Sequence, residues 1–293
     1  MQLKAITVGL ALVLAHPVAA QLRAEDGLAA LDKGDVDTAR AIWEPLATKG
    51  DVLAQYNLGV LLLTGQGDVQ VASEWFEAAA MQGHAPAQRM LAALAVEGED
   101  WARARRWYLT LAEAGEADAQ LTVAKIMERG LGGAADPEGA LLWYRAAAEH
   151  GLVQAQFSLA AMLAEQGADA EAANWFEAAA HQGDVHAQYN LAVALMRGLG
   201  REVDEVAARA WYLRAAQSGH APAMRNLALM QARGRGGAQS FRFALAWALN
   251  AYALDEPGAD DLVEALREVM SDAAIAEAEA LVADCLHGAV DCG

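Results

Sequence analysis

DVHAQYNLAVALMRGLGREVDEVAARAWYLRAAQSG, residues 184–219, is the stretch that decides the fold, because most of the chain repeats it. One marker of the repeat is a glycine followed four residues later by an alanine. This marker recurs at steps of 33, 32, 36, 32 and 36 residues, with its glycines at Gly50, Gly83, Gly115, Gly151, Gly183 and Gly219. A period of this size predicts a stack of small repeated units in place of one globular core.

An aromatic pair, eight residues before the glycine, keeps the same period. The pairs are Trp75–Phe76, Trp107–Tyr108, Trp143–Tyr144, Trp175–Phe176 and Trp211–Tyr212. Ile42–Trp43 starts the column and Trp247 continues it, so seven of the eight tryptophans belong to the repeat. We therefore expect the tryptophans to pack in a core, and not to form a platform for a sugar or a cofactor.

Each unit is predicted to hold two helices. After Ala54, the residues Leu58, Leu61 and Leu62 follow helical spacing, and Gly59 beside them leaves room for a close neighbour. The second helix carries an alanine three residues before the aromatic pair, so alanines and tryptophans are expected to interdigitate. Glycines after the first helices are expected to supply left-handed caps, at Gly65, Gly67, Gly130, Gly132, Gly198, Gly200, Gly234 and Gly236.

Three motifs carry a family resemblance: AQYNLG at residues 54–59, the Gly-x-Gly turn, and a late Trp-Tyr-x-x-Ala-Ala as at residues 211–216. Together they resemble the Sel1-like repeat, a relative of the tetratricopeptide repeat. The resemblance implies an all-α fold, a right-handed α-α superhelix or solenoid of helix hairpins. About six repeats are expected, at residues 51–83, 84–115, 116–151, 152–183, 184–219 and 220–255.

The first twenty residues have the parts of a cleavable secretory signal peptide. They carry one basic residue, Lys4, then an apolar run, and end in small residues, which predicts cleavage near Ala20–Gln21. An ordinary buried N-terminal helix is the alternative, and the run is too short to span a bilayer. The mature chain is therefore expected to be periplasmic or secreted, without membrane insertion.

The two ends of the repeat array are predicted to be caps. Residues 21–50 form an N-terminal capping helix pair, in which Pro45 predicts a kink or an early stop. Residues 256–293 form C-terminal capping helices, at about 260–270 and 272–287. A disulfide between Cys285 and Cys292 is the simplest use of two cysteines in an oxidising compartment.

Composition excludes some partners. The formal net charge is -18, which opposes binding to nucleic acid or to an anionic membrane surface.

Motifs that would indicate catalysis or cofactor binding are weak in this sequence. Residues 130–135 fit G-x-G-x-x-A, but a helix precedes them and the same turn recurs in other copies, so a structural turn is favoured over a phosphate site. His181 and His186 flank a turn, where zinc would need further ligands. We predict no catalytic residue, no cofactor and no metal.

A candidate binding surface remains. By analogy with tetratricopeptide stacks, the first helices line a concave side, where positions counted from Gly59 and its equivalents collect cations and aromatic residues. The predicted partner-binding residues are Tyr56, Arg89, Lys125, Arg129, Phe157, Tyr189, Arg197, Arg225 and Arg233. Arg129, Arg197 and Arg233 each precede a glycine cap, where a cation stabilises the helix dipole by about 0.3–1 kcal/mol, so capping is an alternative role for them. Both roles can hold.

The resemblance implies interaction or adaptor roles, including regulation of an envelope protein such as a sensor kinase. We therefore predict a non-catalytic periplasmic protein whose concave surface holds another protein or a peptide segment of acidic and aromatic character. The alternative is an envelope hydrolase of the weak β-lactamase or penicillin-binding type described for cysteine-rich relatives. That precedent transfers poorly, because neither the cysteine spacing of those relatives nor a Ser-x-x-Lys motif is present.

Overall fold

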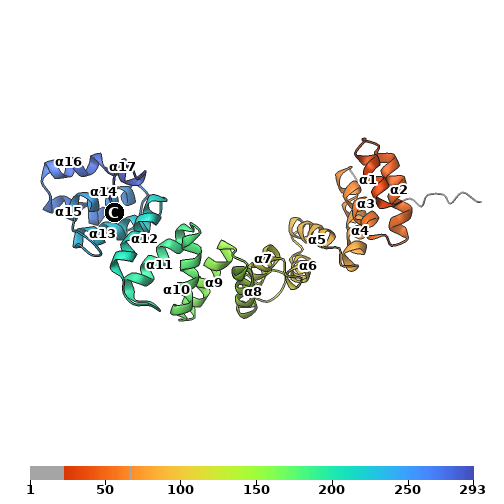
Figure 1. The fold of residues 1–293 in the computed structure, drawn as a ribbon, viewed down its shortest axis with the longest axis horizontal. Coiled ribbons are helices and arrows are strands. Elements are labelled where there is room, and N and C mark those ends of the chain that lie inside the picture. The colour runs from red at the N-terminus through yellow and green to blue at the C-terminus, as the bar shows by residue number, and fades with distance from the viewer. Residues whose placement is uncertain (1–22, 66–67) are drawn as a thin grey trace, which may run out of the picture. The chain divides into compact units, whose positions relative to one another are not determined.

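The computed structural model describes residues 23–65 and 68–293, and all regular secondary structure in these ranges is helical (Figure 1). The expected signal peptide and Gly67 lie outside the described residues. The chain divides into two compact units, with unit 1 ending at Leu94 and unit 2 beginning at Ala95, inside α5 (Ala85–Glu97). The other helices of unit 1 are α1 (Ala24–Leu31), α2 (Val36–Thr48), α3 (Val52–Thr64) and α4 (Val69–Met81).

Unit 2 continues the same alternation of first and second helices. Its helices are α6 (Trp101–Glu113), α7 (Ala117–Glu128), α8 (Pro137–Glu149), α9 (Val153–Glu165), α10 (Asp169–His181), α11 (Val185–Arg197), α12 (Glu205–Gln217), α13 (Ala221–Arg233), α14 (Phe241–Tyr252), α15 (Ala259–Val269), α16 (Asp272–Ala280) and α17 (Val282–Leu286). In unit 1 each helix from α1 to α4 packs against its neighbour along the chain, and in unit 2 the same holds from α6 to α15. The last helices, α16 and α17, pack on α14. The predicted fold class, an all-α solenoid of helix hairpins, is confirmed.

The repeated glycine has a backbone reason. Each of the six glycines that mark the repeat adopts a positive φ, for example +93° at Gly50 and +87° at Gly219. Only glycine adopts this left-handed conformation without a steric cost from Cβ. The glycine therefore ends one hairpin and lets the chain turn into the first helix of the next.

The two residues of an aromatic pair are not equally buried, contrary to the prediction. In four of the five pairs the second residue is the core residue: Phe76, Tyr144, Phe176 and Tyr212 are buried, whereas Trp75, Trp143, Trp175 and Trp211 are only half-buried. In the fifth pair Trp107 is buried and Tyr108 is half-buried. Neighbouring helix positions point about 100° apart, so only one of the two can face the partner helix directly. The expectation that every repeat tryptophan fills the core is therefore wrong for these four. It is correct for Trp43, Trp107 and Trp247.

A buried glutamine explains the Ala-Gln step in five of the repeats. Its side-chain Nε2 donates to the backbone carbonyl eight residues earlier, near the end of the preceding second helix. The pairs are Gln55 to Ala47 (3.1 Å), Gln88 to Ala80 (3.1 Å), Gln120 to Ala112 (3.3 Å), Gln156 to Ala148 (3.3 Å) and Gln188 to Ala180 (3.4 Å). Carbonyls at a helix C-terminus lack partners within their own helix, so this amide joins consecutive hairpins.

Three local expectations are corrected. Pro45 does not stop α2, which runs on to Thr48; Pro45 and Ala41 are exposed, so water can reach the carbonyl that the proline leaves without a donor. Gly65 has φ of −96° and is not a left-handed cap. The last predicted helix is broken at Leu281 into α16 and α17. Within the described part of the chain, no helix combines the length and the apolar character that crossing a membrane requires.

The C-terminal tail folds back onto the last repeats. Cys285 and Cys292 are bonded at 2.04 Å, and both are fully buried. The carbonyl oxygen of Cys292 accepts hydrogen bonds from Trp247 Nε1 at 3.1 Å and from Gln231 Nε2 at 2.5 Å. The buried Arg209 donates to the carbonyl of Gly293 at 3.0 Å. The tail is therefore part of the packed end of unit 2.

Candidate functional site

The predicted binding residues divide between the two units. Tyr56 and Arg89 belong to unit 1, and the other seven belong to unit 2. The half-buried ring of Tyr56 contacts the rings of Phe76 and His84, with centroids 5.8 and 4.8 Å apart. Arg89 is exposed on α5.

The predicted aromatic residues of unit 2 form a row that continues from repeat to repeat. Phe157 lies 5.9 Å from Phe176 and 5.9 Å from His186, measured between ring centroids. Tyr189 lies 5.8 Å from Tyr212 and 4.7 Å from His220. Each ring is thus half-buried between the second aromatic of its own hairpin and the turn that opens the next one. These rings are supporting residues as much as contact residues.

Two histidines join that row, at 5.3 Å between the ring centroids of His186 and His220. His220 also begins α13, where its Nδ1 accepts a hydrogen bond from the amide of Ala223 at 3.3 Å. Burial lowers the pKa of His220, and the neighbouring His186 lowers it further. An imidazole that accepts through Nδ1 is uncharged at that nitrogen, so the geometry and the pKa direction agree.

Three of the predicted binding cations, Lys125, Arg129 and Arg225, have separate surroundings. Lys125 Nζ donates to Gln154 Oε1 at 2.7 Å, and burial lowers the pKa of this lysine. Arg129 is the exposed C-cap of α7, where it faces the helix dipole as the capping role requires. Arg225 is half-buried beside Gly258, and its buried Nε has no hydrogen-bond partner among the described residues.

Arg197 and Arg233 are brought together. They are the last residues of α11 and α13 and line one pocket of about 260 Å³, with Met196, Leu229, Tyr212 and Arg235. Neither Arg197 nor Arg233 forms an ion pair with any described residue. Both keep the helix-terminal position that suits capping, and both remain available to an anionic group.

Sequence reasoning missed Arg235 and Tyr212 as pocket residues. Arg235 stands in the turn after α13 and binds Glu205 through Nε at 2.9 Å and Nη2 at 2.5 Å. Its only signal in the sequence is a charged residue inside a Gly-x-Gly turn. Tyr212 forms the floor, and burial raises its pKa to about 12, so the phenol stays protonated.

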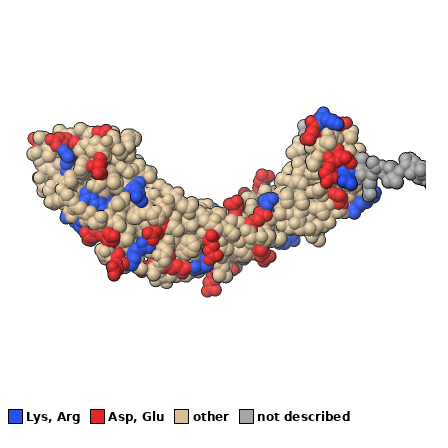
Figure 2. All heavy atoms as spheres, viewed as in Figure 1, with Lys and Arg blue, Asp and Glu red and all other residues tan. Residues whose placement is uncertain are grey.

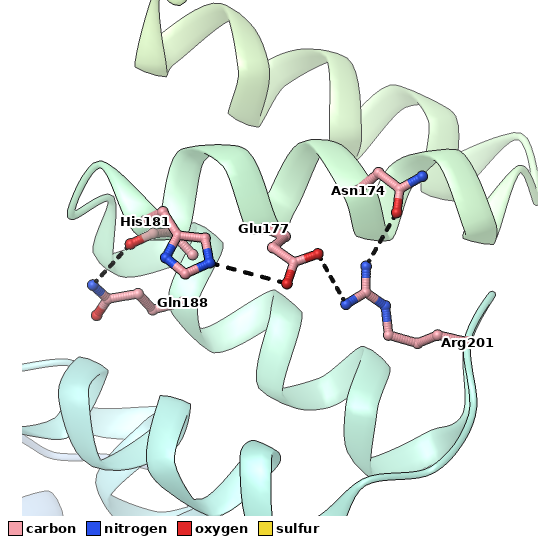
Figure 3. A network of polar contacts seen from close by, with 6 residues as sticks. Asn174, Glu177, His181, Gln188 and Arg201 are labelled. Carbon is pink, nitrogen blue, oxygen red and sulfur yellow. Dashed lines mark hydrogen bonds and ion pairs between the residues drawn. The ribbon is translucent and has the colours of Figure 1, made fainter.

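A separate polar network ties two repeats together (Figure 3). Arg201, in the turn after α11, reaches Glu177 at 3.3 Å and Asn174 at 3.4 Å, both on α10. His181 lies 4.0 Å from the other oxygen of Glu177, at the limit of an ion pair. Exposed pairs of this kind contribute about 0–1 kcal/mol each, so the network positions the turn more than it stabilises the fold.

The motifs considered for chemistry have structural roles. Gly132 packs on the N-terminus of α6, where a Cβ would meet the carbonyl carbon and oxygen of Trp101 at 2.4 Å, so the turn is filled by protein. His181 turns its ring edge to Trp211, whereas His186 packs on Phe157 and His220. Across residues 23–65 and 68–293, no group of three or more His, Cys, Asp or Glu side chains is placed to hold a metal ion.

Charged side chains of both signs are spread over the viewed face of unit 2, with uncharged surface between them (Figure 2). The candidate site is therefore local: two arginines without ion pairs and one paired arginine around a tyrosine floor.

Comparison with known proteins agrees with the architecture. The Sel1 repeat model matches residues 52–84, 117–152, 153–184, 185–220 and 221–256, more than half of the chain. A search of curated proteins gave no significant match. A protective antigen present in uropathogenic Escherichia coli strains, described as displaying an SLR fold, shares 26% identity at a TM-score of 0.52, over 91% of this chain and 69% of its own. A Sel1 repeat protein from Oxalobacter formigenes shares 21% identity at a TM-score of 0.50, over 87% of this chain and 95% of its own. With two markers in one register, paired helices throughout both units and five matched repeats, the chain belongs to the Sel1 repeat family.

Proposed function

We propose that this chain is a non-catalytic binding protein of the bacterial envelope, which holds a segment of another protein on the first-helix face of unit 2. The first-helix face is the surface formed by α7, α9, α11 and α13. Sel1 repeat proteins generally act as scaffolds for protein interaction, and a stack of repeats offers an extended surface in place of an enclosed active site.

One observation carries the proposal. In a chain of net charge -18, Arg197 and Arg233 meet at one pocket without an ion-pair partner among the described residues. Carboxylates outnumber basic side chains by 39 to 21, and these two arginines still have no carboxylate as an ion-pair partner within residues 23–65 and 68–293. An acidic group of a partner would form ion pairs with these two arginines. Such pairs determine which partner binds, and in which orientation, more than they determine the affinity.

The envelope location rests on two supports. Residues 1–20 have the composition of a signal peptide, and the buried disulfide between Cys285 and Cys292 suits an oxidising compartment. A regulatory or adaptor role toward another envelope protein, such as a sensor kinase, fits this location. Fractionation of the producing bacterium should place the chain in the periplasm or the medium, with its new N-terminus at Gln21.

Site-specific photo-crosslinking in that bacterium tests the binding role. A crosslinking residue at Leu229, on the rim of the pocket, is expected to capture one defined protein. The same residue at Leu142, which is exposed on α8, serves as the control. Capture at Leu229 should be lost in the Arg197→Glu/Arg233→Glu background. Equal capture at both positions, or capture that survives the charge reversal, would contradict the proposal.

A nitrocefin assay separates this role from the envelope-hydrolase alternative. Purified protein is expected to give no turnover above buffer. Turnover that persists after repurification would replace the binding proposal with an enzymatic one.

A further inference from the structure

A second pocket lies one repeat before the arginine pocket, and it has the opposite chemistry. It has a volume of about 240 Å³ and is lined by side chains of α9, α10 and α11, including Ala161, Phe176 and Val193. Its one charged lining residue is Asp169. We call it the apolar pocket, and we call the pocket of Arg197 and Arg233 the arginine pocket.

The two pockets are built from the same repeat positions. Counted from the repeat glycines Gly183 and Gly219, counterparts in the two pockets stand 36 positions apart: Phe176 corresponds to Tyr212, Val193 to Leu229, and Leu199 to Arg235. The backbone frame is shared, and the side chains at two of these positions change its chemistry. The apolar pocket has Phe176 and Leu199 where the arginine pocket has Tyr212 and Arg235, and the arginine pocket also holds Arg197 and Arg233.

Both volumes are small. Pockets for metabolites and cofactors usually measure about 300–1,000 Å³, whereas each of these is sized for a single side chain. An apolar side chain suits the first, because Ala161, Phe176 and Val193 offer no partner for a charge and Asp169 repels an acid. A carboxylate suits the second, because two arginines there are not neutralised.

The pockets lie on either side of α11, which contributes Val193 to the first and Arg197 to the second. Their separation is therefore about one helix diameter, or about 10 Å. In an extended segment of polyproline II type, side chains three positions apart lie on one face and about 9 Å apart along the chain. Such a segment places one side chain in each pocket.

We infer that the first-helix face of unit 2 recognises an extended segment of another protein that carries an apolar and an acidic side chain about three positions apart. The apolar side chain occupies the apolar pocket, and the acidic one occupies the arginine pocket. This inference rests on the proposed function and adds to it the chemistry and the spacing of the partner's residues.

Selection from a phage library of random linear peptides tests the inference. Peptides enriched on the wild-type protein are expected to pair an apolar with an acidic residue at this spacing. Arg197→Ala/Arg233→Ala is a suitable variant, because it removes both guanidinium groups and keeps a strong helix former at the ends of α11 and α13. Selection on Arg197→Ala/Arg233→Ala is expected to keep the apolar preference and lose the acidic one.

Affinity measurements with a selected peptide extend the test. By fluorescence anisotropy, Arg197→Ala/Arg233→Ala should weaken binding about tenfold, since each exposed ion pair contributes little by itself. A second variant, Ala161→Arg, adds a cation to the lining of the apolar pocket, so it should weaken the same peptide and favour one with two acidic positions. Circular dichroism and melting of each variant establish that its fold is retained.

Three outcomes would overturn the inference, and they are distinguishable. Enriched peptides without the acidic residue, or an acidic preference unchanged in Arg197→Ala/Arg233→Ala, would reject the pocket assignment and leave peptide binding intact. No enrichment on the wild-type protein would reject the proposed function and the inference with it. Concentration-dependent self-association that Arg197→Glu/Arg233→Glu abolishes, measured by light scattering, would make a second copy of this chain the occupant.

Discussion

Gly27 of α1 lies directly against the indole ring of Trp43 in α2, so closely that a Cβ on residue 27 would stand 2.3 Å from the indole Nε1. That nitrogen donates to the carbonyl of Ala24 at 2.8 Å, and the indole is 1% exposed. The ring can therefore neither move outward nor turn without losing its hydrogen bond. Glycine at residue 27 is what lets the first hairpin close over a tryptophan.

Gly27→Ala is expected to destabilise the first hairpin of unit 1 by up to about 2 kcal/mol. Overpacking costs about 1–3 kcal/mol, and the better helix propensity of alanine returns about 1 kcal/mol. Hydrogen exchange of the α1 and α2 amides measures the effect, which should be confined to that hairpin because repeats depend mainly on their neighbours. Trp43→Phe in the same background tests the cause: if the two changes are additive, the indole is not the source of the clash.

Gln188→Met is expected to loosen the join between α10 and α11 by about 1 kcal/mol. The buried amide of Gln188 donates to Ala180 at 3.4 Å, and a net hydrogen bond contributes about 0.5–1.5 kcal/mol. Methionine is the matched replacement because Met224 stands at this position in the next repeat. Urea unfolding measures the change. The exposed Gln166→Met, at the C-cap of α9, should stay within about 0.5 kcal/mol of the wild type, and an equal loss there would contradict the role of the buried amide.

Repeat markers in the sequence were enough to predict the architecture, because each marker answers a backbone or packing need that recurs in every copy. The glycine of each marker adopts a positive φ, and each aromatic pair contributes a buried residue to the core. Which member of the pair is buried was not predictable from its period, because adjacent helix positions keep the same register and differ only in direction. Trp211 and Tyr212 illustrate this: the tryptophan lies under Arg214 at 4.3 Å, and the tyrosine is buried.

The candidate site was partly predictable for a similar reason. Counting along first helices found Arg197 and Arg233, since both stand at one repeat position. It could not find Arg235, whose direction depends on its bonds to Glu205 in another helix. Counting along first helices also grouped Arg89 with Arg225, although the two residues belong to different units. Their joint role in partner binding therefore stays a prediction.

Acidification should destabilise the hairpin that begins at His220. Burial, followed by the neighbouring His186, lowers the pKa of His220 below its ordinary value of 6.5. As the pH falls, His220 therefore binds a proton near pH 6.5 in the unfolded chain, whereas in the folded chain it stays neutral until a lower pH. The stability that depends on the neutral imidazole is complete above pH 6.5 and is lost as the pH falls toward the lower folded value. Hydrogen exchange of α13 amides between pH 7 and about pH 5, corrected for intrinsic rates, should show this loss.

His220→Asn is the control for that prediction. Asparagine caps helix N-termini well and does not titrate, so it keeps the acceptor for the Ala223 amide and removes the proton site. The variant should lose less stability than the wild type over the same pH range. An unchanged pH dependence would assign the effect to other groups, such as His84, whose pKa is also lowered by burial and, to a smaller extent, by Arg89.

Removal of the disulfide should release the tail without unfolding the repeats. Cys285 and Cys292 close a loop with a sequence separation of 7, and loop-closure entropy gives such a bond about 2.5 kcal/mol. The tail is also held by the bonds from Trp247 and Gln231 to the Cys292 carbonyl, so Cys285→Ser/Cys292→Ser should raise exchange at residues 285–293 and expose the indole of Trp247. Fluorescence quenching reports that indole, which is fully buried in the oxidised protein. Amides of α3 and α4 serve as the internal reference, because they belong to unit 1 and should exchange as before. If those amides also lose protection, the disulfide does not act locally. If the tail keeps its protection after reduction, its packing on α14 holds it in place without the disulfide.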